Sequence, residues 1–285
     1  MLNTIRSKQI FTIGAIILLV GFLFTRDIKG LVKPKEENGK APVTAGRMAT
    51  GQEATINLAE ISAAAKNSIN PNLAAEITTL EQSFTTATDK AAAAKALAQK
   101  WDDLEQTVPS ALYLEILATN EKSLNNWLAA GDKFSKAFDN TRDSLLQPAL
   151  LQKANTSYSN ALALDSTNVD AKTGLGITIV NGMGMPMQGI AMLLDVVKKD
   201  PKNLKANMSL GTFAIKSGQF DKAITRFQDI IAIKPTPDAY FYLGTAYENL
   251  GKKSEAIAAY LESKKLAANP TLSKFIDDKI IELKK

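Results

Sequence analysis

Residues 204–236 read LKANMSLGTFAIKSGQFDKAITRFQDIIAIKPT, and residues 237–269 read PDAYFYLGTAYENLGKKSEAIAAYLESKKLAAN. In register, the two segments share a leucine-glycine pair, a second glycine several positions later and an alanine-centred second half. A third leucine-glycine pair lies one period upstream, at Leu175 and Gly176. A period of about 34 residues predicts a helix-turn-helix repeat. Because one helix pair cannot bury its apolar face alone, such units stack into a solenoid.

The recurring small residues indicate where helices approach or end. Gly211 and Gly244 allow close contact between the two helices of a unit, and we expect Ala223 and Ala256 to be the small residues that face them. Large side chains at equivalent offsets are predicted to fill the interface. Each unit also needs a turn between its helices and a break before the next unit, and Gly218, Gly251 and Pro235 have these roles in the prediction.

These offsets resemble those of the tetratricopeptide repeat. The resemblance covers about residues 124–285 and implies a right-handed all-α superhelix whose function is to bind other proteins. The positions that carry the repeat signature are Trp127, Gly131, Gly176, Gly211, Ala223, Phe227, Pro235, Tyr240, Gly244, Tyr247, Ala256 and Tyr260.

The repeats are predicted to occupy residues 124–270. Their units are 124–168, 169–203, 204–236 and 237–270, and residues 271–285 form an amphipathic capping helix. The first unit carries about eleven extra residues around Phe138–Pro148, which require a longer first helix or an ordered loop. The second has one extra residue in its turn, within the methionine-rich segment Asn181–Gln188.

Two regions precede the repeats. Residues 33–53 contain Pro and Gly without apolar periodicity, which predicts a flexible tether. Residues 54–122 are rich in alanine and predict helices, with a break at Asn70-Pro71 and a divergent repeat between Asp89 and Lys122. These helices either cap the solenoid or form a dimerising coiled coil, although they contain barely two heptads.

Residues 1–32 predict a membrane anchor. The uncharged run IFTIGAIILLVGFLF at 10–24 follows Arg6 and Lys8 and precedes Arg26. As a helix it would span roughly 23 Å, at the short end for a bilayer. The alternative is a cleaved signal peptide, but no small-x-small cleavage site follows Phe24. We therefore predict a retained single span in the inner membrane of a bacterium.

The side of the membrane on which the solenoid lies is less clearly indicated. The positive-inside count favours the cytoplasm, whereas the order of basic tail and apolar run favours export. We favour the periplasmic side.

Composition excludes several classes of function. The chain has no His and no Cys, which removes most zinc, haem and iron-sulfur ligation, thiol nucleophiles and His-based catalytic groups. We accordingly predict no enzyme activity, no metal and no cofactor. The net charge of +5 is concentrated in residues 1–40, which carry seven basic and three acidic residues. A nearly neutral body is a poor partner for phosphate backbones, so we predict no nucleic-acid binding.

In the tetratricopeptide family, ligands contact the second, fifth, ninth and twelfth positions of each first helix. The resemblance places the protein-binding surface on these positions, where an apolar centre would suit a segment with hydrophobic anchors. Several of them would alternatively only pack against the next repeat. The candidates are Leu128, Asp132, Thr173, Ile177, Val180, Met208, Thr212, Ile215, Phe241, Thr245 and Glu248.

The sequence thus predicts a membrane-anchored adaptor that binds an unidentified protein through the concave surface of the solenoid. A second hypothesis is an assembly subunit, in envelope biogenesis or protein translocation, that self-associates through the alanine-rich helices. The Asn181–Gln188 loop is a second candidate contact site, because methionines adapt to varied apolar surfaces.

Overall fold

The computed structural model describes residues 56–182 and 184–285, and within them every regular element is an α-helix. These residues belong to one compact unit. The first four helices precede the repeats that the sequence predicts. The next eight form those repeats, and the last corresponds to the predicted capping helix. Their bounds are α2 Leu58–Asn67, α3 Pro71–Thr86, α4 Lys90–Asp103, α5 Thr107–Asn120, α6 Leu124–Asn140, α7 Leu146–Leu164, α8 Val169–Gly182, α9 Pro186–Lys199, α10 Leu204–Lys216, α11 Phe220–Ile233, α12 Pro237–Asn249, α13 Lys253–Leu266 and α14 Pro270–Leu283.

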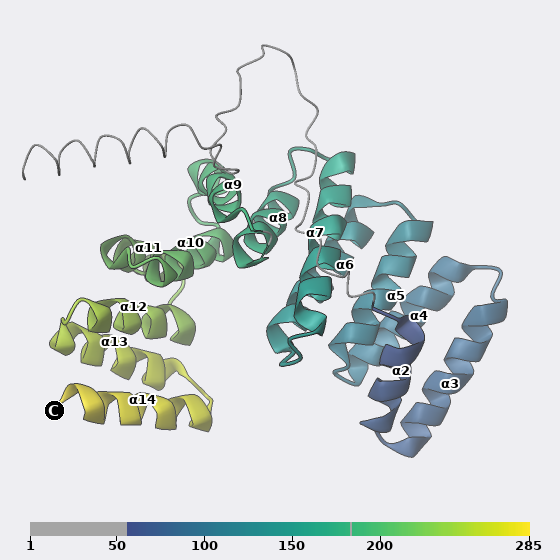
Figure 1. Cartoon of the computed structure of the whole chain (residues 1–285), viewed down its shortest axis with the longest axis horizontal. Helices are drawn as coiled ribbons and strands as arrows, with labels where there is room; N and C mark the ends of the chain where they lie inside the picture. Colours follow the sequence, from purple (N-terminus) through teal and green to yellow (C-terminus); the bar gives the residue numbers. More distant parts are fainter. Residues whose placement is uncertain (1–55, 183) are drawn as a thin grey trace, which may run out of the picture. The chain divides into compact units, whose positions relative to one another are not determined.

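Consecutive helices pack side by side along the chain, which confirms the predicted all-α solenoid (Figure 1). The helix pairs are α6/α7, α8/α9, α10/α11 and α12/α13, and α4/α5 forms a similar pair before them. We call α6, α8, α10 and α12 the first helices and their partners the second helices. Each first helix also contacts the helix that precedes it in the chain, so the hydrophobic core continues from pair to pair.

Local signals start and end the helices at the expected places. Asn203 and Thr236 cap α10 and α12, because their side chains accept hydrogen bonds from the backbone N–H of Ala206 and Ala239 at 2.9 and 3.2 Å. Gly218 and Gly251, in the turns inside the last two pairs, have φ of +73° and +71°. This left-handed conformation disfavours a side chain, which explains the glycine at both positions.

An aromatic ring packed on a glycine joins the helices in three of the four pairs. A β-carbon at Gly131, Gly211 or Gly244 would lie 2.7 Å from the nearest ring carbon of Tyr158, Phe227 or Tyr260, respectively. Each ring comes from the second helix and is buried. At Gly211 and Gly244 the nearest atoms belong to the rings of Phe227 and Tyr260, while Ala223 and Ala256, expected to face these glycines, are fully buried on the same second helices.

The α8/α9 pair replaces the ring by an aliphatic side chain and a second glycine. Leu193 stands where the other pairs have Tyr or Phe, and a β-carbon at Gly176 would lie 3.0 Å from it. A β-carbon at Gly189, on α9, would lie 2.6 Å from the backbone oxygen of Gly176. Here the two helix backbones themselves are in close contact.

The extra residues of the first unit lengthen its helices. The α6 helix has 17 residues and α7 has 19, whereas α10 and α11 have 13 and 14. Only residues 141–145 remain between α6 and α7. The structure thus takes the first of the two expected solutions, a longer first helix, and lengthens the second helix as well.

The alanine-rich region folds onto itself and onto the first repeat. Ile77, Leu97, Trp101 and Tyr113 are buried together in a core built by α2 to α5. Ile61 of α2 belongs to the same hydrophobic cluster as Phe134 and Leu150 of the α6/α7 pair. The apolar residues of α3, Ile77, Leu80 and Phe84, therefore pack into this core.

The predicted anchor at 10–24 and the predicted tether at 33–53 lie outside the described residues. Among the helices that the structure does describe, none is long and apolar enough to cross a membrane.

We predict that Gly211→Ala lowers the free energy of unfolding by about 1–3 kcal/mol, because the new methyl group would collide with the Phe227 ring. The double variant Gly211→Ala/Phe227→Leu should recover part of this loss, since Leu193 already packs beside Gly176 in the α8/α9 pair. Urea denaturation measures both.

Thr225→Ala is the matched control, because Thr225 lies on the exposed side of α11, the helix that carries Phe227. Its effect should stay within about 0.5 kcal/mol. An equal loss for Gly211→Ala and Thr225→Ala would contradict the ring-on-glycine contact.

Candidate protein-binding surface

The expected ligand-facing positions differ widely in exposure. Asn125, Asp170, Lys205 and Asp238, at the second position of each first helix, are all exposed. Leu128, Ile177, Val180, Met208 and Ile215 are half-buried and pack against neighbouring core clusters. Thr173 is only 1% exposed, so it lies in the interior and not on a binding surface.

In α6 and α12, the polar residues at the ninth and twelfth positions lie within hydrogen-bonding distance of a tyrosine hydroxyl group. Tyr158 Oη donates a hydrogen bond to Asp132 Oδ1 at 2.9 Å and lies 3.2 Å from Ser135 Oγ. Tyr260 Oη likewise donates to Glu248 Oε2 at 2.6 Å and lies 3.3 Å from Thr245 Oγ1. Burial, reinforced by the adjacent carboxylate, raises the pKa of both tyrosines, so each hydroxyl stays protonated as a donor.

Where the second helix carries no hydroxyl, the twelfth position is apolar. The ring partner of α10 is Phe227, and the residue at the twelfth position is Ile215. The aliphatic partner of α8 is Leu193, and the corresponding residue is Val180. Contacts inside each helix pair can therefore explain whether these positions are polar or apolar, without a requirement for binding to a ligand.

Helix α14 contacts the expected ligand-facing residues of the last unit. The Phe241 ring centroid lies 6.0 Å from that of Phe275, and Lys279 Nζ donates to Glu248 Oε1 at 2.8 Å. The predicted amphipathic character of α14 is visible in its exposure: Lys274, Asp277, Asp278 and Lys284 are exposed, whereas Ile276 and Ile280 are buried. Phe275 remains 48% exposed.

An ion pair connects first helices that are not neighbours in the chain. Lys205 Nζ of α10 lies 3.3 Å from Asp132 Oδ1 of α6, and both side chains are more than half exposed. The pair passes over α8, which lies between them in sequence and contacts both helices. Asp132 and Lys205 therefore share one face of the stacked first helices.

Asp139, which the sequence analysis did not single out, affects the ionisation of a tyrosine on α12. Burial, Asp238 and Asp139 together raise the pKa of the Tyr242 hydroxyl, which places carboxylates of α6 and α12 near one α12 side chain. Asp139 lies one helical turn after Ser135, in the part of α6 that exceeds the usual length. The family pattern of ligand-facing positions ends at the twelfth residue of the first helix, and Asp139 is the sixteenth residue of α6. The only sequence signal for Asp139 was therefore the insertion that lengthens this helix.

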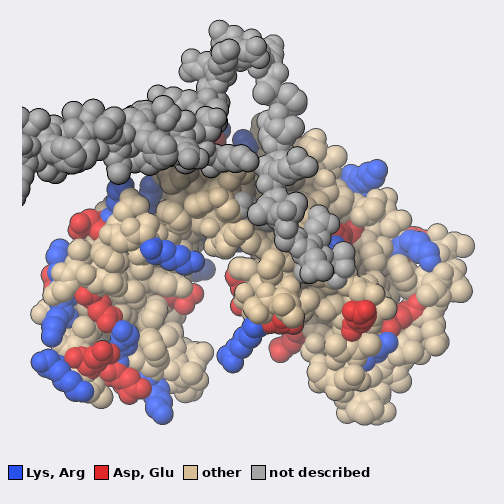
Figure 2. Space-filling model, in the orientation of Figure 1, with Lys and Arg blue, Asp and Glu red and all other residues tan. Residues whose placement is uncertain are grey.

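Acidic and basic side chains are intermixed over α10 to α14 on the face shown in Figure 2. A surface of this kind carries no extended field of one sign that would attract a phosphate backbone. Among the described residues, no group of three or more Asp or Glu side chains is placed to hold a metal ion.

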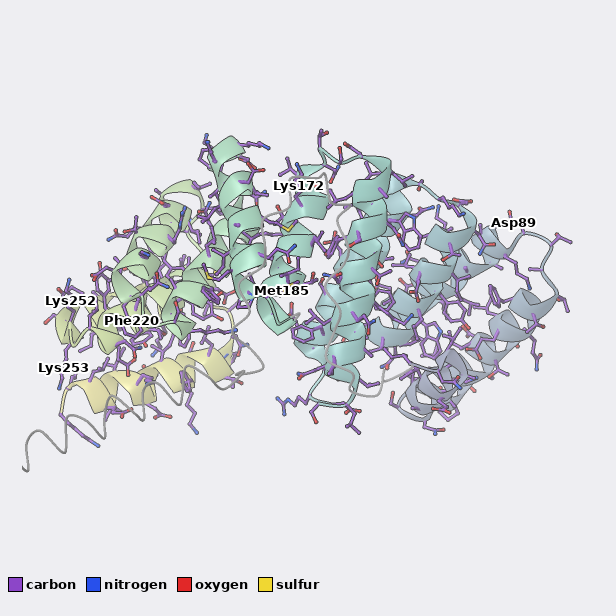
Figure 3. All side chains as sticks on the ribbon, turned by 45° about the horizontal axis from the view of Figure 1, so that its top comes forward. Asp89, Lys172, Met185, Phe220, Lys252 and Lys253 are labelled. Atoms are coloured by element: carbon purple, nitrogen blue, oxygen red, sulfur yellow. The ribbon has the colours of Figure 1, made fainter. Side chains whose placement is uncertain are left out.

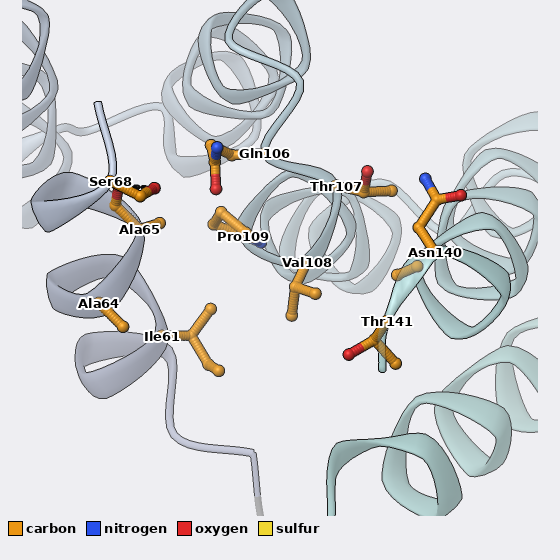
Figure 4. A pocket seen from close by; sticks show the side chains of 11 residues that line it. Ile61, Ala64, Ala65, Ser68, Gln106, Thr107, Val108, Pro109, Asn140 and Thr141 are labelled. Carbon is orange, nitrogen blue, oxygen red and sulfur yellow. Dashed lines mark hydrogen bonds between the residues drawn. The ribbon is translucent and has the colours of Figure 1, made fainter. Parts of the chain in front are cut away.

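A separate cleft lies between α2, the start of α5 and the end of α6 (Figure 4). It has a volume of about 340 Å³, and its walls include Ile61, Val108 and Pro109 on one side and Asn140 and Thr141 on the other. None of the side chains that line it is ionisable. The cleft offers apolar contacts with a polar edge, and no acid or base.

Comparisons with known proteins agree with this architecture. Residues 214–271 match the family model described as tetratricopeptide repeat. A search of curated proteins finds no match.

Among solved structures, a thermophilic tetratricopeptide repeat protein of Thermus thermophilus is 17% identical, with a TM-score of 0.53 over 67% of this chain and 99% of that one. A tetratricopeptide repeat protein from Parabacteroides merdae is 12% identical, with a TM-score of 0.54 over 80% and 85% of the respective chains.

The fold and the stacked first helices define an all-α helical repeat protein. Within it, residues 214–271 match the tetratricopeptide repeat family.

The Glu248–Lys279 contact predicts how stability depends on pH. Burial pushes the pKa of Glu248 upward, but the hydrogen bonds from Lys279 and Tyr260 outweigh it and lower that pKa overall. The hydrogen bond to Glu248 raises the pKa of Lys279. The stabilisation is therefore complete above the ordinary Glu pKa of about 4.3 and below the ordinary Lys pKa of about 10.4.

We predict that Glu248→Gln weakens the loss of stability on acidification, because that loss occurs as pH falls through the folded-state pKa of Glu248. Thermal midpoints of both proteins between neutral pH and about pH 3 measure the difference. Glu262→Gln is the control, since Glu262 makes only an exposed contact with Lys265 at 3.5 Å. Parallel pH profiles for wild type and Glu248→Gln would refute the assignment.

Proposed function

We propose that this protein is a membrane-anchored scaffold that binds another protein on the exposed face of its first helices. The observation that carries the proposal is the set of exposed residues Asn125, Asp170, Lys205 and Asp238 on four successive first helices. The half-buried Ile177, Met208 and Ile215 lie on the same helices, one or more turns along, and can contribute apolar contact area. Tetratricopeptide repeats elsewhere bind proteins in this way, which supports the class of function.

Anchoring rests on the sequence alone, on the apolar run at 10–24 and its basic flanks. We further propose a single span in the inner membrane with the repeats on the periplasmic side. The test is extraction of membranes with alkaline carbonate, in which the anchored protein should stay in the pellet. Release into the supernatant, or a mature N-terminus after Phe24, would contradict the anchor.

The alternative is an assembly subunit that self-associates through its alanine-rich helices. In the structure Ala65, Ala94 and Ala98 are buried inside the unit, so these small residues already serve intramolecular packing. Ala63, Ala64 and Ala96 remain exposed. Sedimentation of the chain in detergent distinguishes the two, since the scaffold needs no self-association whereas the alternative requires a dimer or larger assembly.

We predict that a photo-crosslinking amino acid at Asp170 or Lys205 captures the partner in intact cells, because both side chains are exposed on the first helices. The same probe at Gln228 or Asp229, exposed on the second helix α11, should capture much less of it. The readout is the relative yield of one adduct band, identified by mass spectrometry. Adducts only at Gln228 and Asp229 would place binding on the second helices instead.

A second test changes charge on the proposed surface. Asp170→Lys and Lys205→Glu leave the ring-on-glycine contacts intact, so both variants should melt close to wild type while losing at least several-fold in partner affinity. Ile177→Asp or Phe241→Asp is a poorer test, because these side chains also pack against neighbouring helices. Unchanged affinity in both charge variants would overturn the proposed surface.

A further inference from the structure

The α8/α9 pair contains a long uncharged segment with an exposed turn. No Asp, Glu, Lys or Arg occurs among the 22 residues from Thr173 to Leu194, whereas 22% of the whole chain is charged and about five would be expected. Figure 3 shows Met185 at the turn between α8 and α9. Met185 and Met187 are 42% and 70% exposed. Met183 lies outside the described residues.

Helix α9 continues this apolar surface along its outer side. Met187, Ala191, Leu194 and Lys198 follow one another at the spacing of a single helical stripe, and all four are exposed. We call these four residues the α9 stripe. The stripe is uncharged over its first three residues and ends in a lysine.

Further lysines surround the charged end of the stripe. Lys199 Nζ lies 2.9 Å from Asp195 Oδ2, and the hydrogen bond from Lys199 together with the charges of Lys172 and Lys198 lowers the pKa of Asp195. Lys172, Lys198 and Lys199 therefore outnumber the carboxylates of Asp195 and Asp200 at this end of the helix. An apolar stripe with a cationic end is typical of helices that lie in a membrane interface.

The equivalent positions of α11 and α13 differ in part. On α11 they are Asp221, Thr225, Gln228 and Ala232, of which the first three are polar. On α13 they are Ser254, Ala258, Leu261 and Lys265, so only Ser254, in place of Met187, differs from the stripe. Leu261 is 49% exposed, close to the 44% of Leu194, and Glu262 stands where α9 has Asp195. Helix α13 therefore offers a matched surface without the methionine and with one added carboxylate, Glu255.

We propose that the α9 stripe docks onto the surface of an anionic lipid bilayer, with Met187 and Leu194 entering the headgroup region and Lys198 and Lys199 contacting anionic headgroups. The inference rests on the proposed anchoring. A flexible 21-residue tether, as the sequence predicts at 33–53, would have a root-mean-square end-to-end distance of roughly 25 Å. It would keep the repeats at high local concentration near the membrane, so even weak surface affinity would suffice.

Area favours a bilayer over a protein on this stripe. A stable protein interface buries about 800 Å² on each partner, far more than four side chains on one helix provide. A lipid surface needs only shallow insertion of a few apolar groups, and each nearby lysine adds about 1 kcal/mol at an anionic membrane. Docking of α9 would leave the exposed residues of the first helices available to the protein partner.

The absence of cysteine from the chain permits a clean test with single-cysteine variants of the full-length protein. Met187→Cys and Ser254→Cys, each labelled with the fluorophore NBD, are reconstituted into phosphatidylcholine vesicles with and without about one third phosphatidylglycerol, a composition chosen to give roughly a physiological surface potential. Flotation with the vesicles reports anchoring. Quenching by spin-labelled lipid reports contact of the labelled residue with the bilayer.

We expect the label at 187 to shift to the blue and to be quenched several-fold more than the label at 254, and only in anionic vesicles. Leu194→Asp/Lys198→Glu should abolish the quenching at 187, while Leu261→Asp, its match on α13, should not. Flotation without quenching at 187 would overturn α9 docking and leave anchoring intact. A blue shift without lipid quenching would indicate a protein contact and would also overturn it. Failure to float would overturn the anchor and the docking together.

Discussion

A ring packed on a glycine is the contact on which three of the four helix pairs depend. Tyr158, Phe227 and Tyr260 lie so close to Gly131, Gly211 and Gly244 that no side chain fits between them. Because the hydrophobic cluster around each ring also takes residues from a neighbouring helix pair or from α14, an error at this contact would disturb the packing next to it. Close packing of this kind tolerates little extra volume, which is why glycine recurs while the covering residue varies between Tyr, Phe and Leu.

The same contact determines much of the surface that the first helices present. A tyrosine ring brings a hydroxyl to the edge of its pair, and Asp132 or Glu248 accepts its hydrogen bond. A phenylalanine or leucine brings none, and Ile215 or Val180 stands in the equivalent place. Residues that hold a pair together thus alternate with exposed residues, chiefly those at the second positions of the first helices. If the first helices bind a protein and α9 contacts the membrane, one small solenoid could do both at the same time.

Each of the units that the sequence predicted at 204–236 and 237–270 contains one helix pair, and α14 follows them, because the two units repeat the same turns and glycines in register. The sequence left two solutions open for the insertion around Phe138–Pro148, since helix length depends on packing that no local signal encodes. The site was less predictable. Burial of Thr173 and the contacts of Phe241 and Glu248 with α14 arise from packing between different helices. A pattern of positions within one helix contains no information about them.

The most direct test of the account is the NMR chemical shift of the glycine α-protons. Aromatic ring currents should move the α-protons of Gly131, Gly211 and Gly244 strongly upfield, because each glycine lies against the ring of Tyr158, Phe227 or Tyr260. Gly176, which packs against Leu193, should keep an ordinary shift. Ordinary shifts at all four glycines would contradict the ring-on-glycine contact and, with it, the way in which these helix pairs are held together.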